Sequence, residues 1–249
     1  MSEFTILVIG AIVGFLSGLL GKGGSAITTP ALQIFAGINP FAALASPLPA
    51  TLPTTISASV AYGKEKLINK KVVSGCILLG IPATFLGSVF SDRIGGGTLM
   101  ILTAIFVLTL GISFFVIHTV PDTSTEPKIP FWKIAFVAIP VGFLSGLLAN
   151  SGGVLFGPLF IRFLKMPTKQ ALSSSLLVAA GLAIPGTIAH WYLGHVDWKI
   201  VLLLSLSSIP FSYLGAKLAI RMNNQLLETI FGIMLIAFGG FDLWYSIVH

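Results

Sequence analysis

The stretch from Gly14 to Leu20, which reads Gly-Phe-Leu-Ser-Gly-Leu-Leu, occurs a second time from Gly142 to Leu148. The two copies lie 128 residues apart, and the same offset aligns further pairs along the chain. These pairs are Pro30 with Pro158, Ala43-Leu44 with Ala171-Leu172, Ile81-Pro82 with Ile209-Pro210, and Leu86-Gly87 with Leu214-Gly215. Similar composition alone would not keep prolines in register over this distance. We therefore expect two equivalent halves, residues 1–118 and 132–249, joined by a linker at 119–131.

The composition identifies the environment of these halves. Of the 249 residues, 55% are hydrophobic and only 9% are charged, against about 25% charged in an ordinary soluble domain. Apolar runs approach the length of about twenty residues that a helix needs to cross a bilayer, whereas barrel strands would be shorter and would alternate. We therefore expect an all-α integral membrane protein. The first run begins at Phe4 without preceding basic residues, so it is predicted to be a retained span and not a signal peptide.

Each half contains five apolar segments, of which the second is short. The segments lie at about 4–20, 25–36, 41–61, 72–90 and 98–118 in the first half, and at about 133–148, 153–164, 169–189, 200–216 and 226–247 in the second. Segments 25–36 and 153–164 are too short to cross as straight helices. They are predicted to be either re-entrant or part of a broken span.

The positions of the basic residues predict how the halves are oriented. If all ten segments cross and the N-terminus lies outside, only Arg93 and Lys199 fall on the outer side, and the other Lys and Arg residues fall in inner loops. Eight crossings would divide the basic residues about evenly between the two sides. Five crossings per half invert the second half relative to the first. We therefore expect an inverted-topology repeat of five segments each, an architecture typical of secondary transporters, with a cytoplasmic linker.

Two glycine-rich loops precede the short segments. Glycine allows close approach and unusual backbone shapes, and the first turn of a helix has unpaired N–H groups that attract anions. If the two loops meet near the midplane of the membrane, these N–H groups and the ammonium of Lys22 would form a site for a small anion. The predicted substrate-binding residues are Lys22, Gly23, Gly24, Ser25, Asn150, Ser151, Gly152 and Gly153. In the alternative, the glycines only allow close helix packing and Lys22 extends to the membrane surface.

Further polar residues in apolar segments are candidates for the walls of a pathway. Prolines in segment 41–61 free backbone carbonyls, and hydroxyl groups lie nearby and in segment 169–189. The candidate pathway residues are Ser46, Thr51, Ser174, Ser175 and His190. For any one hydroxyl, a bond back to its own helix is an equally good interpretation, and His190 fits an interfacial aromatic belt better than a proton relay. The acidic residues fall at predicted loops and segment ends, and no buried carboxylate pair is apparent.

The chain resembles the TauE/SafE family of sulfite exporters over nearly its whole length. The features that carry the resemblance are the stretch from Gly14 to Ser25 and its copy, the segment from Gly194 to Lys199, Ile209-Pro210, and the segment from Leu214 to Leu218. The resemblance implies a multi-pass secondary transporter of the cytoplasmic (inner) membrane, which exports sulfite, an organosulfonate or a related small anion by alternating access. The second loop departs from the first, because Asn150 replaces Lys22.

The expected partners are a small anionic substrate and the lipid bilayer. A coupling ion, H⁺ or Na⁺, is left open, as is a homodimer. No cofactor and no metal site is expected, and Cys76 as the single cysteine excludes disulfides and metal–thiolate clusters. The net charge of +6 is attributed to inner loops and not to nucleic-acid binding. An enzyme is not expected, since the stretch from Gly14 to Gly18 is one residue too long for the Gly-x-Ser-Gly motif of an intramembrane protease. A passive anion channel remains the alternative to a carrier.

Overall fold

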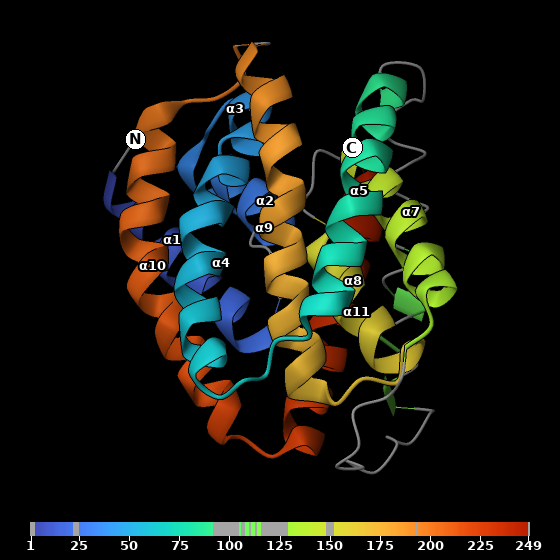
Figure 1. The fold of residues 1–249 in the computed structure, drawn as a ribbon. Coiled ribbons are helices and arrows are strands. Elements are labelled where there is room, and N and C mark those ends of the chain that lie inside the picture. Colours follow the sequence, from blue (N-terminus) through green and yellow to red (C-terminus); the bar gives the residue numbers. More distant parts are fainter. Residues whose placement is uncertain are drawn as a thin grey trace.

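The structure is a computed structural model that describes residues 3–21, 25–91, 105, 108–109, 111–112, 114–115, 129–147, 152–192 and 194–248. Within these residues the chain is helical and contains no strand (Figure 1). The helices are α1 (Glu3–Leu20), α2 (Ser25–Ala36), α3 (Pro40–Ala45), α4 (Pro47–Lys64), α5 (Lys70–Ser91), α7 (Phe131–Leu147), α8 (Gly153–Arg162), α9 (Thr168–Tyr192), α10 (Trp198–Arg221) and α11 (Asn224–Val248). Most of the predicted segment 98–118 and of the linker 119–131 lies outside the described residues.

The helices have the length and surface of membrane-spanning elements. Among the described residues, five helices are long and apolar enough to cross a membrane, in Glu3–Leu20, Lys70–Ser88, Thr168–Tyr192, Trp198–Arg221 and Asn224–Phe241. Large apolar side chains such as Leu78, Phe136 and Leu202 point outward and are exposed, as a surface in contact with lipid requires. The prediction of an all-α membrane protein is confirmed.

The predicted segment 41–61 differs from the structure, which breaks it at Ser46 into α3 and α4. Pro47 and Pro49 lack the N–H groups that would bond to the carbonyls four residues earlier. Proline is nevertheless favoured in the first turn of a helix, where those N–H groups have no partner. The two prolines therefore end one helix and begin the next.

Two helix pairs hold the halves together, and each pair joins one helix from each half. Helix α1 packs along α10, and α7 packs along α5, in the two most extensive helix contacts of the described chain. In the first pair, a Cβ at Gly18 would collide with the carbonyl of Ser212, and in the second a Cβ at Gly146 would collide with the carbonyl of Thr84. Gly146 and Thr84 are the residues that the 128-residue offset relates to Gly18 and Ser212. The two interfaces are therefore equivalent.

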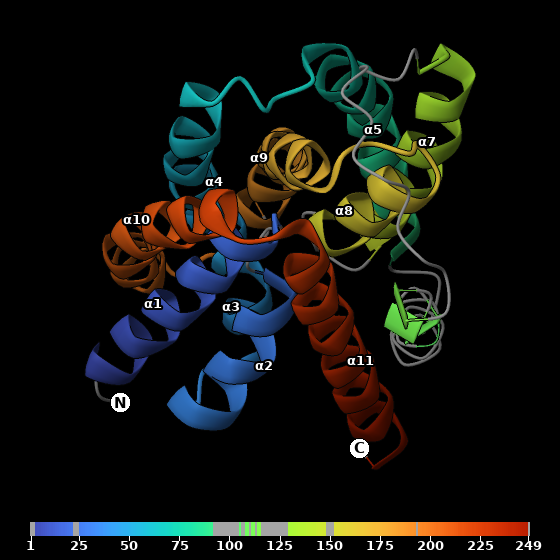
Figure 2. The same ribbon diagram turned by 90° about the horizontal axis from the view of Figure 1, so that it is seen from below.

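The equivalent helices run in opposite directions. In Figure 1, α1 and α10 descend from top to bottom, whereas α7 and α5 ascend. The ion pair of 2.6 Å between Glu3 and Lys199 agrees with this, since it joins the N-terminal ends of α1 and α10. This arrangement supports an inverted repeat, while the full set of five plus five crossings stays a prediction. Helices α4 and α9 contact each other between the two pairs, and α9 lies at the centre of the bundle in Figure 2.

Candidate functional site

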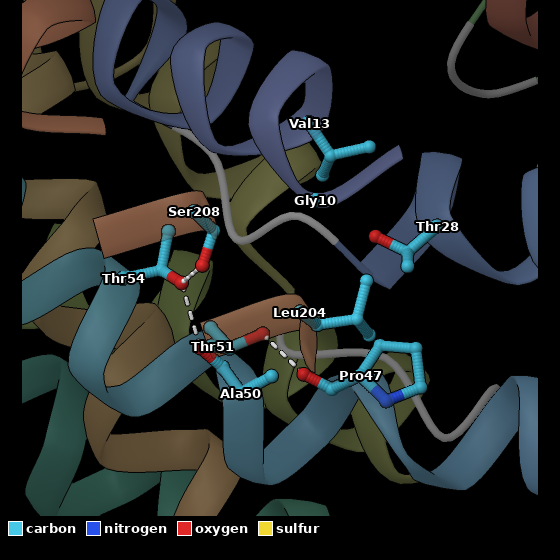
Figure 3. A pocket seen from close by; sticks show the side chains of 9 residues that line it. All are labelled: Gly10, Val13, Thr28, Pro47, Ala50, Thr51, Thr54, Leu204 and Ser208. Carbon is cyan, nitrogen blue, oxygen red and sulfur yellow. Dashed lines mark hydrogen bonds between the residues drawn. The ribbon is translucent and has the colours of Figure 1, made fainter. Parts of the chain in front are cut away.

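A small cavity of about 20 Å³ lies between α1, α2, α4 and α10. Such a volume corresponds to about one water molecule. Its lining residues are Gly10, Val13, Thr28, Pro47, Ala50, Thr51, Thr54, Leu204 and Ser208 (Figure 3). The four hydroxyl-bearing residues among them are each at most 5% exposed, so their polar groups depend on partners within the protein.

Two hydroxyl groups of the cavity, those of Thr51 and Thr54, donate to carbonyl oxygens of their own helix. The Thr51 hydroxyl donates to the Pro47 carbonyl at 2.9 Å, and the Thr54 hydroxyl donates to the Ala50 carbonyl at 2.7 Å. Thr54 Oγ1 and Ser208 Oγ lie 2.5 Å apart (Figure 3). A hydroxyl has a single proton, and that of Thr54 is used in its bond to Ala50. We therefore assign Ser208 as the donor in this pair, in preference to its longer contact of 3.5 Å with the Ser205 carbonyl. Thr51 and Thr54 therefore present oxygen lone pairs to the cavity.

Two cross-helix bonds fix this geometry by holding α4 against α10. The Ser212 hydroxyl donates to the Thr54 carbonyl at 2.9 Å, and the Ser57 hydroxyl donates to the Ile209 carbonyl at 2.8 Å. Pro53 inside α4 has no N–H group, so the carbonyl of Pro49, beside the cavity wall, loses its helical donor. The cavity thus lies beside a point of α4 at which one backbone hydrogen bond of the helix is missing.

The cavity lies near the N-terminal end of α2. Thr28 belongs to the first turns of α2, which begins at Ser25. Gly21 ends α1 with a φ of 65°, a conformation that favours glycine, and its carbonyl accepts a hydrogen bond from the Ser175 hydroxyl. Lys22, Gly23 and Gly24 lie outside the described residues, as does the side chain of Ser25. The predicted role of this loop in binding stays a prediction.

The second glycine loop is described only at its end. Asn150 and Ser151 lie outside the described residues. Gly152 caps the N-terminus of α8 with a φ of 68°, and Gly153 is the first residue of that helix. A Cβ at Gly152 would lie 3.2 Å from the Ser145 hydroxyl and 3.1 Å from the Phe156 ring. Both short helices therefore start at a glycine-rich loop, as predicted, and whether the loops form one site is not tested.

Of the five candidate pathway residues, Thr51 lines the cavity and the others lie elsewhere. Ser46 Oγ accepts the N–H of Asp197 at 3.0 Å, and Ser174 Oγ accepts the N–H of Asn69 at 3.0 Å. Ser175 donates to Gly21 as described above. His190 is half-buried, with its Nδ1 atom 3.3 Å from Nδ1 of His195. Ser46 and Ser174 therefore make contacts that join helices to loops.

The structure adds lining residues that the sequence did not single out, notably Thr28, Thr54 and Ser208. Thr54 belongs to the same proline-rich run as Thr51, and this run was the sequence feature from which Thr54 could have been predicted. Ser208 directly precedes Ile209-Pro210, a pair noted for its place in the repeat and in the family resemblance. Its pairing with Thr54 bridges 154 positions of sequence, and no local pattern predicts such a contact.

The place that the 128-residue offset relates to this cavity is filled mainly with apolar side chains. The 128-residue offset relates Thr28 to Phe156, Thr54 to Leu182 and Ser208 to Gly80. Phe156 and Leu182 are fully buried in the main core, and Leu182 packs directly against Gly80. The hydrogen-bonded pair of Thr54 and Ser208, which joins the two halves, is thus replaced by an apolar contact. Among the counterparts of the nine lining residues, the one hydroxyl is that of Ser175, the counterpart of Pro47, and it donates to the Gly21 carbonyl.

One acidic residue at a predicted segment end is buried. Glu228, in the first turns of α11, is 3% exposed and accepts a hydrogen bond from the Thr168 hydroxyl. The guanidinium of Arg162 lies over the Phe114 ring, 4.3 Å from its centroid. Among the described residues, no group of three or more His, Cys, Asp or Glu side chains could hold a metal ion.

Comparison with known proteins places the chain in a family. The model of the family described as Sulfite exporter TauE/SafE matches residues 6–241. A probable membrane transporter protein of Xylella fastidiosa (strain 9a5c) is 30% identical and covers 95% of this chain and 93% of its own length. The probable membrane transporter protein YunE of Bacillus subtilis (strain 168) is 27% identical, with 95% and 94% covered. No solved structure matches. The chain therefore belongs to the TauE/SafE family, whose curated relatives are named probable membrane transporters.

Proposed function

We propose that this protein is a secondary transporter that exports a small anion, such as sulfite or an organosulfonate, across the cytoplasmic membrane. The anion rests between the two glycine-rich loops, and alternating access exposes it to one side at a time. The residues proposed to bind it are Lys22 to Ser25 and Asn150 to Gly153. Membership of the TauE/SafE family supports the transport activity, and the family description supports sulfite as the first substrate to test.

The observation that most supports an anion site is the way in which the two short helices begin. Helices α2 and α8 each begin directly after a glycine-rich loop, and their first N–H groups have no helical acceptor. The helix dipole adds positive potential at the same end. Lys22 lies in the loop before α2, and Asn150 takes the equivalent place before α8, so the site draws its only full positive charge from the first half.

Flux in reconstituted vesicles tests this proposal. Purified protein is placed in liposomes loaded with sulfite, and efflux is followed against the sulfite concentration. Lys22→Ala should raise the concentration needed for half-maximal efflux, whereas Lys22→Arg, which retains the charge, should raise it less. Lys70→Ala, at the start of α5, is the matched control for loss of a lysine outside the site. Unchanged sulfite transport by Lys22→Ala would remove this residue from the site.

The same vesicles separate a carrier from a passive channel. A carrier saturates with substrate and exchanges labelled anion across the bilayer, because each turnover needs a conformational change. A channel at fixed potential conducts at a much higher rate per molecule, and its flux of labelled anion is not stimulated by unlabelled anion on the opposite side. Stimulated exchange of labelled sulfite would support the carrier mechanism. A measurable electrical conductance of a single protein molecule would instead support the channel mechanism.

A further inference from the structure

We propose that the hydroxyl-lined cavity between α1, α2, α4 and α10 binds a small monovalent cation, Na⁺. The inference goes beyond anion transport and concerns a separate set of residues. It rests on the bonds made by the hydroxyl groups, on the size of the cavity, on the absence of charge among its described lining residues, and on the difference between the cavity and the place that the repeat relates to it.

The direction of the protons makes the cavity wall an acceptor surface. The Thr51 and Thr54 hydroxyls donate to carbonyls of their own helix at 2.9 and 2.7 Å. The Ser208 hydroxyl, assigned above as the donor to Thr54, has the Ser205 carbonyl at 3.5 Å as its other acceptor. An oxyanion would need donors, so it could bind here only if these bonds broke. A cation needs oxygen lone pairs, which Thr51 and Thr54 already present. The wall therefore suits a cation and disfavours the anion of the proposed transport activity.

The size of the cavity and the chemistry of its wall select among cations. A space of about 20 Å³ takes one water or one dehydrated small ion. Divalent cations such as Ca²⁺ are held in proteins through carboxylates, and the residues lining the cavity include none. None of them titrates near neutral pH either, so the cavity does not carry a proton. Neutral oxygen ligands near a broken helix are the usual setting for Na⁺ in transporters with internal repeats.

The asymmetry of the repeat shows that packing does not require these hydroxyls. At the place that the repeat relates to the cavity, Thr28, Thr54 and Ser208 are replaced by Phe156, Leu182 and Gly80, which are well packed and apolar. The one hydroxyl of that place, of Ser175, donates to the Gly21 carbonyl. At the cavity, four buried hydroxyl groups, from Thr28, Thr51, Thr54 and Ser208, instead bring oxygen from three helices around one space. A bound cation accounts for that difference.

Thermal unfolding of the purified protein tests the site without any transport assay. The melting temperature Tm is measured in choline chloride, and choline is then replaced stepwise by Na⁺ or K⁺ at constant ionic strength. Since a ligand that binds only the folded state stabilises it, Na⁺ should raise the Tm of the wild type in a saturable way, and more than K⁺. The Na⁺ concentration at half-maximal effect gives the apparent Kd.

Three variants locate the effect. Thr54→Val and Ser208→Ala each remove one oxygen from the cavity and should raise the apparent Kd for Na⁺ at least about tenfold, as loss of a positioning partner does in other ion sites. Thr54→Ser retains the oxygen and should restore binding. Thr55→Val is the matched control, because Thr55 is also buried in α4 and donates to a carbonyl of its own helix, but does not line the cavity. Its apparent Kd should stay that of the wild type.

Several results would overturn the proposal. A wild type whose Tm responds equally to Na⁺, K⁺ and choline contains only water in the cavity. A Na⁺ response that survives in both Thr54→Val and Ser208→Ala comes from another place, and a response lost equally in Thr55→Val reflects general weakening of α4. If Thr54→Val does not fold, Ser208→Ala decides the question. None of these results affects the Lys22→Ala test of anion transport, so the two proposals fail separately.

Discussion

Replacing Gly18 by alanine tests the close packing of α1 on α10. A Cβ at this position would lie 2.8 Å from the carbonyl carbon of Ser212 and 2.9 Å from the backbone nitrogen of Ala216. Carbon atoms in contact normally lie about 3.5–4.0 Å apart, and both obstacles are backbone atoms that cannot rotate away. Helix α10 must therefore retreat by roughly an ångström, taken as the difference between these distances, and the contacts along the whole pair loosen.

The expected cost follows from two opposing effects. Overpacking costs about 1–3 kcal/mol, and alanine recovers about 0.5–1 kcal/mol because glycine is unfavourable inside a helix. The midpoints of these two ranges leave a net loss of about 1 kcal/mol, which should lower the Tm by about 2–4 °C for a chain of this size. Gly146→Ala, at the equivalent place between α7 and α5, should behave in the same way.

Gly63→Ala is the matched control. Gly63 is an exposed residue of α4 whose added Cβ would meet only the side-chain end of Ile68, at 3.6 Å. It should keep or raise the Tm, since only the helix preference changes. The measurement is thermal unfolding in one detergent, with size-exclusion chromatography to exclude aggregation. A Gly18→Ala protein as stable as Gly63→Ala would refute the close contact between α1 and α10.

Two further predictions concern the core. Phe156→Ala should lower the free energy of unfolding by about 3–5 kcal/mol, because Phe156 is fully buried and its removal leaves a large cavity. Thr28→Ala, at the equivalent place, is the comparison. A fall in Tm no greater than that of Thr28→Ala would contradict this packing. Cys76 is also fully buried, so a soluble maleimide should modify it only after denaturation, and rapid labelling of the folded protein, measured by mass spectrometry, would show that α5 is exposed at this point.

The sequence was sufficient for those features that depend on local pattern. The predicted segment 25–36 coincides with α2, because a glycine-rich loop and a change in polarity mark its beginning and end. The break at Ser46 was missed although Pro47 and Pro49 were visible, since proline is compatible both with a kink and with a helix start. The repeat offset correctly indicated equivalent positions, but it could not show which helices pair.

The cavity illustrates why the rest could not be predicted. It depends on Thr54 meeting Ser208 across 154 positions, and that contact exists only because α4 of the first half packs on α10 of the second. The same offset that relates the halves also conceals their difference, because Thr28 and Phe156 are alike in position and unlike in chemistry. Such differences become meaningful only once the partners in space are known.

The exchange of partners between the halves has a consequence for any shorter version of this chain. Helix α1 packs through its glycines against α10, and α7 packs through its glycines against α5. A polypeptide with one copy of the repeat would carry both kinds of surface with no way to join them within itself. Two such polypeptides would have to form a dimer with opposite orientations in the membrane before these surfaces were covered. Gene duplication would then have joined the two subunits of an obligate dimer into one chain.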